Sequence, residues 1–220
     1  MKLIIPEILP MIGQEQPPEF HPEGDVFEHT TLMLNLMNKE MQPPSVSKKL
    51  LAYTVLLHDV GKPSTAFFDE RIRFHGHESV SGRMSEEILR RLKLPTKEIK
   101  QIVIAVAGHM RFKDVQQMKR ATLRKLIGAE TFDLELELHR LDCEGCHGLL
   151  DNYEYLLEKA GEMDDEPILP DRWVSGKDLI NSGIEPGPQI GKLLQLAYDA
   201  QLEGRFKNRD ALLDWLKTEI

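Results

Sequence analysis

Five amphipathic segments of this chain each carry a histidine or an aspartate on their apolar face. In the first, Leu32, Met33 and Leu36 follow His29 by three, four and seven residues, a spacing that puts all four side chains on one side of an α-helix. A polar group on the inward face of a helix needs a partner in the core, because burying it alone is costly. The pattern therefore predicts an all-α fold in which several polar side chains meet inside the protein.

The inward polar groups share one chemistry, since all are imidazoles or carboxylates. The predicted metal ligands are His29, His58, Asp59, His77, His109 and Asp142. They belong to helices expected over 25–38, 46–59 and 77–92, and to two helices that end near His109 and Asp142. Imidazole nitrogen and carboxylate oxygen together suit borderline divalent metals such as Zn, Mn, Fe, Co or Ni. A single inward histidine is usually an ordinary core residue, but six such groups favour a metal centre.

The remaining histidines are left out of this set; they are His21, His75, His139 and His147. His75 is the least secure exclusion, because it lies two residues before His77 and could contact a substrate. Residues 143–147, CEGCH, match the pattern for covalent haem attachment. That attachment needs export and a signal peptide, whereas prolines interrupt the N-terminal MKLIIPEILP. We therefore expect no haem. Zinc at this CxxC would need two further ligands that the sequence does not clearly offer.

Composition narrows the class of protein. Only two cysteines are present, too few for a disulfide scaffold. No apolar run approaches membrane-spanning length, so we expect a cytoplasmic protein that does not enter a membrane. The net charge of −8 argues against a protein that binds polyanions over its whole surface. A basic stretch over 97–125 surrounds His109 and offers a local place for a phosphate group.

Two boundaries interrupt the helical pattern. Residues 65–74, which contain FFDERIRF, are typical of a short β-hairpin. Pro167 and Pro170 mark a later break, which divides the chain into a metal-binding helical domain over 1–166 and a helical tail over 167–220. Within the tail, helices are expected over 175–181, 189–203 and 208–218.

The order of these motifs resembles a known family. The resemblance rests on HPEGDVFEHTTLML at 21–34, LLHDVGKP at 56–63, FHGHESVS at 74–81, LHRLDCEGCHG at 138–148, SGKDLINSGIEPGPQIGKLL at 175–194 and LEGRFKNRDALLDWL at 202–216. The chain resembles the HD superfamily of metal-dependent phosphohydrolases. More narrowly, it resembles the C-terminal, HD-containing half of the tRNA nucleotidyltransferase (CCA-adding) and poly(A) polymerase family. The resemblance covers nearly the whole chain.

The resemblance implies an HD-type helical domain with a hairpin insertion and a small C-terminal helical subdomain. It also implies a metal-dependent phosphohydrolase, a phosphomonoesterase or 2′,3′-cyclic phosphodiesterase acting on nucleotides or RNA ends. One or two divalent ions (Mn, Ni, Co, Fe, Zn or Mg) would activate water and clamp the phosphoryl oxygens. His58 and Asp59 would be catalytic, with Asp59 bridging the ions. Lys62 and Arg111 would hold phosphate oxygens.

Nucleotidyl transfer is not expected on this interpretation. The family performs that reaction in a head that carries a Gly-Ser turn and paired metal-binding aspartates, and we find neither motif in this sequence. The alternative is a non-catalytic RNA-binding or accessory module related to tRNA nucleotidyltransferases, with tRNA as a partner. The complete ligand set favours the enzyme, because such a module has no physical need for six polar groups in its core.

Overall fold

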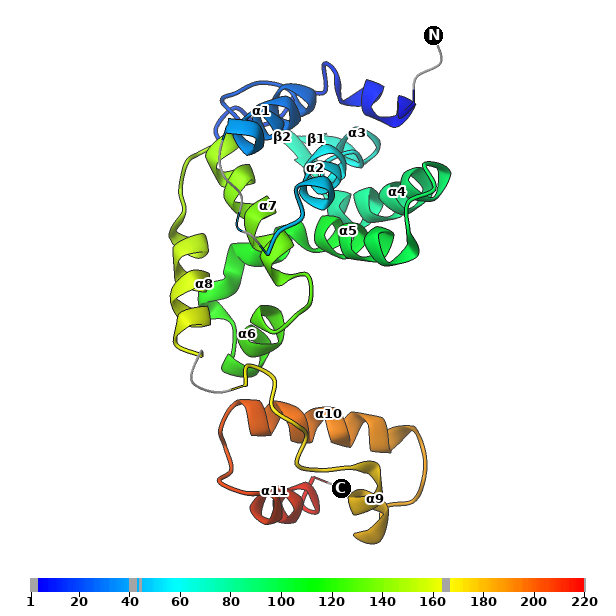
Figure 1. The fold of residues 1–220 in the computed structure, drawn as a ribbon, viewed down its shortest axis with the longest axis vertical. Coiled ribbons are helices and arrows are strands. Elements are labelled where there is room, and N and C mark those ends of the chain that lie inside the picture. The colour runs from blue at the N-terminus through cyan, green and yellow to red at the C-terminus, as the bar shows by residue number, and fades with distance from the viewer. Residues whose placement is uncertain (1–3, 40–42, 44, 164–166, 220) are drawn as a thin grey trace. The chain divides into compact units, whose positions relative to one another are not determined.

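The computed structural model describes residues 4–39, 43, 45–163 and 167–219 (Figure 1). Within these residues the chain is predominantly helical with one two-stranded hairpin, which confirms an all-α fold with a short β-hairpin. The elements are η1 (Pro6–Met11), α1 (Val26–Lys39), α2 (Lys48–Leu57), α3 (Lys62–Thr65), β1 (Ala66–Asp69), β2 (Arg71–Phe74), α4 (His77–Arg91), α5 (Thr96–Gly108), η2 (His109–Gln117), α6 (Arg120–Ile127), α7 (Phe132–Gly145), α8 (Asp151–Gly161), α9 (Gly176–Asn181), α10 (Pro188–Leu202) and α11 (Arg209–Leu216). None of the described helices is long and apolar enough to cross a membrane.

The boundaries differ from the predicted ones where they matter for the site. Helix α2 ends at Leu57, so His58 and Asp59 lie in the turn between α2 and α3 and not inside a helix. The hairpin follows α3 directly, and its strands pair antiparallel with Asp69 opposite Arg71. Glu70 forms the tip in the left-handed region, with φ of 55°. Helices α6 and α8 were not predicted.

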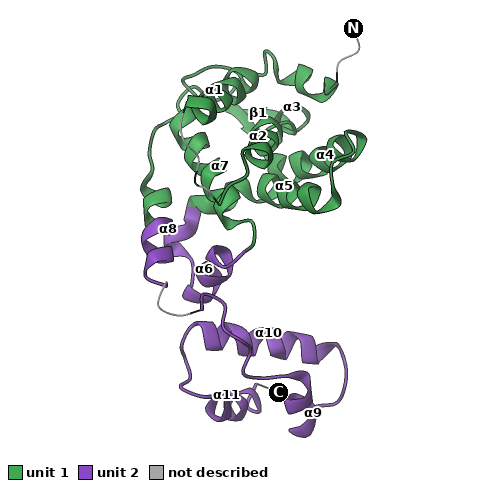
Figure 2. Ribbon diagram, viewed as in Figure 1, with its two compact units in different colours: residues 1–113, 130–155 green, residues 114–129, 156–220 purple. Residues whose placement is uncertain are grey.

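The chain divides into two compact units, coloured separately in Figure 2. The first comprises residues 1–113 and 130–155, and the second comprises 114–129 and 156–220. This division differs from the predicted boundary after residue 166, because α6 belongs with the tail. Glu203, just after α10, accepts a hydrogen bond of 2.8 Å from the backbone amide of Ala121, and Lys125 pairs with Asp199. A proline in the sequence cannot reveal such a long-range contact.

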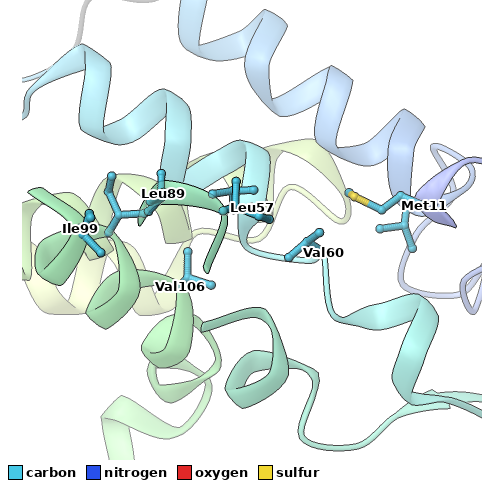
Figure 3. Packing of buried hydrophobic residues seen from close by; sticks show 9 residues of the cluster. Met11, Leu57, Val60, Leu89, Ile99 and Val106 are labelled. Atoms are coloured by element: carbon cyan, nitrogen blue, oxygen red, sulfur yellow. The ribbon is translucent and has the colours of Figure 1, made fainter. Parts of the chain in front are cut away.

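The core of the first unit combines residues of the predicted apolar faces with residues that were not predicted, such as those of η1. One cluster joins η1, the start of α1, the end of α2 with the turn after it, and helices α4 and α5. Its labelled members in Figure 3 are Met11, Leu57, Val60, Leu89, Ile99 and Val106. A second cluster joins α1, α2, α5 and α7 around Met33, Leu51 and Leu138. Helices α4 and α5 approach closely, since a β-carbon on Gly82 would lie 3.0 Å from that of Ala107. These helices surround the predicted ligands.

The second unit has its own core, which includes Val174, Leu179, Leu212 and Leu216. Two of its helices, α9 and α11, begin with side-chain caps. Ser175 and Asp178 form a reciprocal capping box at the start of α9, and Asn208 accepts a hydrogen bond of 3.0 Å from the amide of Ala211 at the start of α11. Such caps satisfy amides that the first turn of a helix leaves unpaired.

Candidate metal centre

The six predicted ligands come from five helical regions of the first unit and meet in its core. His29 lies on α1, His77 begins α4, His109 follows the last residue of α5, and Asp142 lies on α7. His58 and Asp59 occupy the turn after α2. The imidazole rings form a continuous series, with centroid separations of 5.6 Å for His29 and His58, 5.4 Å for His58 and His109, and 5.0 Å for His109 and His77. All five side chains from the histidines and Asp59 are buried.

Gly61 allows the turn that carries His58 and Asp59 to lie against α4. A β-carbon at this position would lie 2.7 Å from the backbone nitrogen of Ser81 and 2.8 Å from the carbonyl oxygen of His77. The amide of Gly61 also donates a hydrogen bond of 2.9 Å to the Ser81 hydroxyl. The LLHDVGKP motif therefore needs its glycine for a close backbone contact, and this contact brings Asp59 towards His77.

Three of the imidazoles have a defined tautomer. The Nδ1 atoms of His58, His77 and His109 lie 2.7–2.8 Å from the backbone carbonyl oxygens three residues earlier. A carbonyl oxygen can only accept, so each Nδ1 carries a proton and donates it. In the neutral ring, each Nε2 then presents a lone pair to the centre. This is the arrangement by which proteins orient histidines for metal binding.

The lone pairs face one another at short range. His77 Nε2 and His109 Nε2 are 3.1 Å apart, and Asp59 Oδ1 lies 3.3 Å from the first and 3.7 Å from the second. With both Nδ1 atoms protonated, neutral rings have no proton to place between these nitrogens. Ligands about 2.1 Å from a common ion lie roughly 3.0–3.4 Å apart at octahedral or tetrahedral angles. Two of the three separations fall in this range and the third, 3.7 Å, is slightly longer, so the three atoms are grouped closely enough to be candidate ligands of one divalent cation.

A second group of ligands adjoins the first. His29 Nε2 lies 3.0 Å from Asp142 Oδ1, and His58 Nε2 lies 3.1 Å from Asp59 Oδ2. Ligand atoms of His29, His58 and Asp142 all lie within 4.8 Å of one another. His58 Nε2 and Asp59 Oδ1 are buried without a hydrogen-bond partner of acceptable geometry. Asp59 thus turns one oxygen towards each group, as a carboxylate shared by two ions would.

Charges in the centre shift the pKa values of its groups. Burial opposes protonation of His29, but hydrogen bonds to Asp142 and Glu23 outweigh it and raise the pKa to about 9. Burial lowers the pKa of His109 to about 4, so this imidazole is neutral at pH 7. Burial alone would raise the pKa of Asp59, yet its neighbours His58 and Lys62 hold it well below its usual range. Metal binding at His29 would therefore displace a proton.

Lys62 and Arg111, the predicted phosphate-binding residues, both contact carboxylates. The buried Lys62 ammonium lies 2.7 Å from Asp59 Oδ2 and donates a 2.6 Å hydrogen bond to Gln16. Arg111 pairs with the buried carboxylate of Glu135. Lys62 thus adds positive charge to the centre, and Arg111 lies outside the ligand groups. Phosphate binding by either residue stays a prediction.

Two residues near the centre were not predicted. Glu23 and His21 lie in the loop before α1, and together with His29 they form a further group of close potential ligands. The helical period used to find the other six does not extend to a loop, although the HPEG sequence at 21–24 does contain both side chains. The other excluded histidines lie elsewhere: His75 and His147 are exposed, and His139 contacts Cys143 and Phe112.

The CxxCH segment forms the end of α7. Both cysteines are free, and burial raises the pKa of each thiol to about 12. Neither cysteine belongs to a group of close potential metal ligands in the described part of the chain. Gly145, between them, lies against α1, where a β-carbon would be 3.4 Å from His29 Cε1. The segment therefore brings α7 close to the centre.

The fold and these side chains define an all-helical protein with a candidate centre for divalent metal. Residues 77–216 match the family model described as tRNA nucleotidyltransferase domain 2. The chain is 32% identical over 193 residues to an A-adding tRNA nucleotidyltransferase of Deinococcus radiodurans, covering 82% of this chain and 43% of that protein. It is 28% identical over 214 residues to a CC-adding tRNA nucleotidyltransferase of Thermus thermophilus, covering 94% and 47%. A multifunctional CCA protein of Acinetobacter baylyi is 35% identical over 128 residues, covering 58% and 29%.

This chain belongs to the tRNA nucleotidyltransferase family. It spans less than half the length of the curated relatives it matches. The prediction of a phosphohydrolase without nucleotidyltransferase activity is wrong, because the relatives are named as tRNA nucleotidyltransferases. No comparison supports a phosphorylated small molecule as the partner. The error came from carrying hydrolysis over from the resemblance to the HD superfamily, since imidazoles and carboxylates indicate what can bind a metal and do not identify the chemistry.

Proposed function

We propose that this chain binds tRNA as part of a tRNA nucleotidyltransferase, and that a divalent-metal centre stabilises its helical core. The observation that carries the first part is the family match, which extends from the start of α4 to the end of α11. The relatives covered by this match act on tRNA according to their names. The proposal follows the alternative given by the sequence, an RNA-binding module related to tRNA nucleotidyltransferases. It adds that this module is part of such an enzyme.

A group of positive side chains in the second unit supports contact with RNA. Lys119 and Arg120 begin α6, while Arg205 and Lys207 lie in the loop between α10 and α11. The Arg120 guanidinium is 3.6 Å from the position that a β-carbon would take on Gly204, so the two segments are adjacent. All four side chains belong to exposed residues. None of them forms an ion pair with another residue that the structure describes.

Arg205 is held in place by aromatic rings. Its guanidinium lies 4.6 Å from the ring centroid of Trp215 and 5.6 Å from that of Phe206. Stacking of this kind restricts a guanidinium without using its hydrogen-bond donors. Those donors stay available for phosphate oxygens, which are the main contacts of proteins with nucleic-acid backbones. The local charge is thus suited to RNA, although the net charge of the chain is −8.

Binding of labelled tRNA at several salt concentrations tests this proposal. Removing one phosphate contact should weaken binding and reduce the slope of log affinity against log salt by about 1. We expect this result for Arg120→Ala and for Arg205→Ala. Lys217→Ala is the matched control, because Lys217 lies in the same unit and pairs with Asp214 on its own helix. Equal tRNA affinity in all four proteins would contradict the proposed surface.

For the metal centre, His77, His109 and Asp59 would hold one ion, and His29, His58 and Asp142 would hold another. A divalent ion there would accept the facing lone pairs and add to the positive charge that Lys62 places beside Asp59. Because the ligands come from α1, the turn after α2, α4, the end of α5 and α7, binding ties five segments together. Such coupling makes the binding free energy part of the folding free energy. The HD-type arrangement is thus proposed in a structural role.

Elemental analysis of the purified chain after dialysis against Mn²⁺, Co²⁺ or Zn²⁺ tests the centre. Wild type should retain at least one ion per chain, and Asp59→Ala should lose it, because Asp59 faces both groups. His147→Gln is the control, since this imidazole is exposed and lies outside the centre. Negligible metal in wild type after supplementation would exclude a metal centre of useful affinity.

A further inference from the structure

Glu23 lies in the loop before α1 and directs its carboxylate to His29. Its Oε1 atom is 2.6 Å from His29 Nδ1, and the two side chains are 8% and 0% exposed. The opposite nitrogen of the same ring, Nε2, lies 3.0 Å from Asp142 Oδ1 within the candidate metal centre. His29 therefore stands between a carboxylate outside the centre and the ligands inside it.

This contact gives His29 Nδ1 a charged neighbour on the side of the ring that faces away from the centre. Both nitrogens of His29 lie beside carboxylates, Nδ1 beside Glu23 and Nε2 beside Asp142. An ion bound at Nε2 would displace the proton there and leave the remaining proton of the ring on Nδ1, facing Glu23. The other three histidines of the centre obtain the same tautomer from backbone carbonyls. Among these four, His29 has a charged acceptor in that position. A charged acceptor makes an imidazole a stronger metal ligand than a neutral carbonyl does.

The loop that carries Glu23 is held firmly by local contacts. Gly24 has φ of 130°, and a β-carbon there would collide with the carboxylate of Glu28. Asp25 and Glu28 exchange hydrogen bonds of 3.0 and 2.8 Å between their amides and carboxylates. The amide of Gly13 donates a further 2.7 Å bond to Asp25. These contacts give the Glu23 backbone a defined position at the start of α1.

A third ion between Glu23 and His29 does not fit this geometry. Two ligands of one tetrahedral ion lie roughly 3.4 Å apart, given metal–ligand distances of about 2.1 Å. The 2.6 Å separation of Glu23 Oε1 and His29 Nδ1 is a hydrogen-bond distance. His21 Nδ1 lies 2.9 Å from the same oxygen, which is also a hydrogen-bond distance. The loop is thus suited to orienting a ligand from outside the metal site.

We infer that Glu23 is a positioning residue of the metal centre, which orients the His29 ring for metal binding at Nε2 through its contact with Nδ1. The inference rests on the metal centre proposed above. It adds to the centre a carboxylate that does not contact the ion. Loss of such a carboxylate typically weakens metal binding about 10–100-fold.

The test is a titration of the full-length chain with Co²⁺, followed by its visible absorption spectrum and by competition with a coloured chelator. Glu23→Gln keeps the shape and one acceptor oxygen but removes the charge. We expect Co²⁺ affinity to fall about 10–100-fold, while the number of ions bound at saturation stays the same. The absorption band should shift, because the donor strength of His29 changes. Glu19→Gln is the control, since Glu19 precedes the same loop and is 64% exposed.

The outcomes separate this inference from the metal centre itself. If wild type binds Co²⁺ and Glu23→Gln matches Glu19→Gln in affinity and spectrum, the positioning role is refuted and the centre stands. If Glu23→Gln loses one ion at saturation, Glu23 is a ligand and the inference is equally wrong. If wild type binds no Co²⁺, the centre itself fails. Should Glu23→Gln not fold by circular dichroism, Glu23→Asp provides the comparison, and unchanged affinity and spectrum there would refute the role.

Discussion

Adding a divalent metal should raise the melting temperature of this chain by an amount that depends on free metal in a defined way. The candidate ligands are brought together by folding, and they come from segments as far apart in sequence as His29 and Asp142. An ion that binds only the folded state stabilises it by about 2.7 kcal/mol at a free concentration 100 times its Kd, and by about 4.1 kcal/mol at 1,000 times. For a chain of this size, 1 kcal/mol corresponds to roughly 2–4 °C.

The expected shift is therefore about 5–11 °C at 100 times Kd. Each further tenfold rise in free metal adds about 1.4 kcal/mol, or roughly 3–6 °C, if one ion binds. If two ions bind with similar affinity, the increment doubles, so the slope reports the number of ions. Calorimetry with buffered Co²⁺ or Mn²⁺ measures it. The concentration range must exceed Kd, because no linear dependence on log concentration is expected below it.

Two variants decide whether the shift arises at the candidate centre. His109→Gln removes an inward Nε2 from the pair of imidazoles that lie 3.1 Å apart, and should abolish most of the shift. His147→Gln changes an exposed imidazole and should keep all of it. A full shift in His109→Gln, or its loss in His147→Gln, would refute the reasoning. A chelator should reverse the wild-type shift.

Three other predictions concern the fold. Gly61→Ala should destabilise the chain by about 1–3 kcal/mol in urea unfolding, because its β-carbon would overlap the Ser81 backbone; an unchanged midpoint would refute this. Leu57→Ala should cost about 3–5 kcal/mol in the same assay, since Leu57 is fully buried, and a loss below 1 kcal/mol would contradict the packing. The Ser175 hydroxyl lowers the pKa of Asp178 to about 2 from 3.8. The stabilisation that the ionised Asp178 contributes should be complete above about pH 4 and disappear as pH falls towards about 2. Acid titration followed by circular dichroism measures this dependence, and Asp178→Asn should lack it.

The candidate metal ligands and the family membership lead to different expectations about function. The resemblance to the HD superfamily implied phosphate-ester hydrolysis, whereas the relatives are named as tRNA nucleotidyltransferases. Ligand chemistry restricts the metal more than it restricts the reaction. A structural role for the ion reconciles the candidate ligands with the family membership. Such a role uses Asp59 and its buried neighbours as ligands and requires no hydrolytic activity.

The sequence alone predicted the helical class and the six side chains that the structure brings together. It could do so because helical period records the phase of a residue on its own helix, and a polar residue in phase with leucines must point inward. His29, His77 and His109 were found in this way, as was the hairpin from its alternating pattern. Their metal binding stays a prediction.

Only the tertiary structure decided which groups face each other. The pairing of Glu23 with His29, of Lys62 with Asp59 and of Arg111 with Glu135 depends on distances between segments that have no common period. The inclusion of α6 in the second unit was decided in the same way, by contacts with α10 and the residue after it. Periodicity is a property of one segment, whereas a contact is a property of two, and the chain path between them is set only when the core packs.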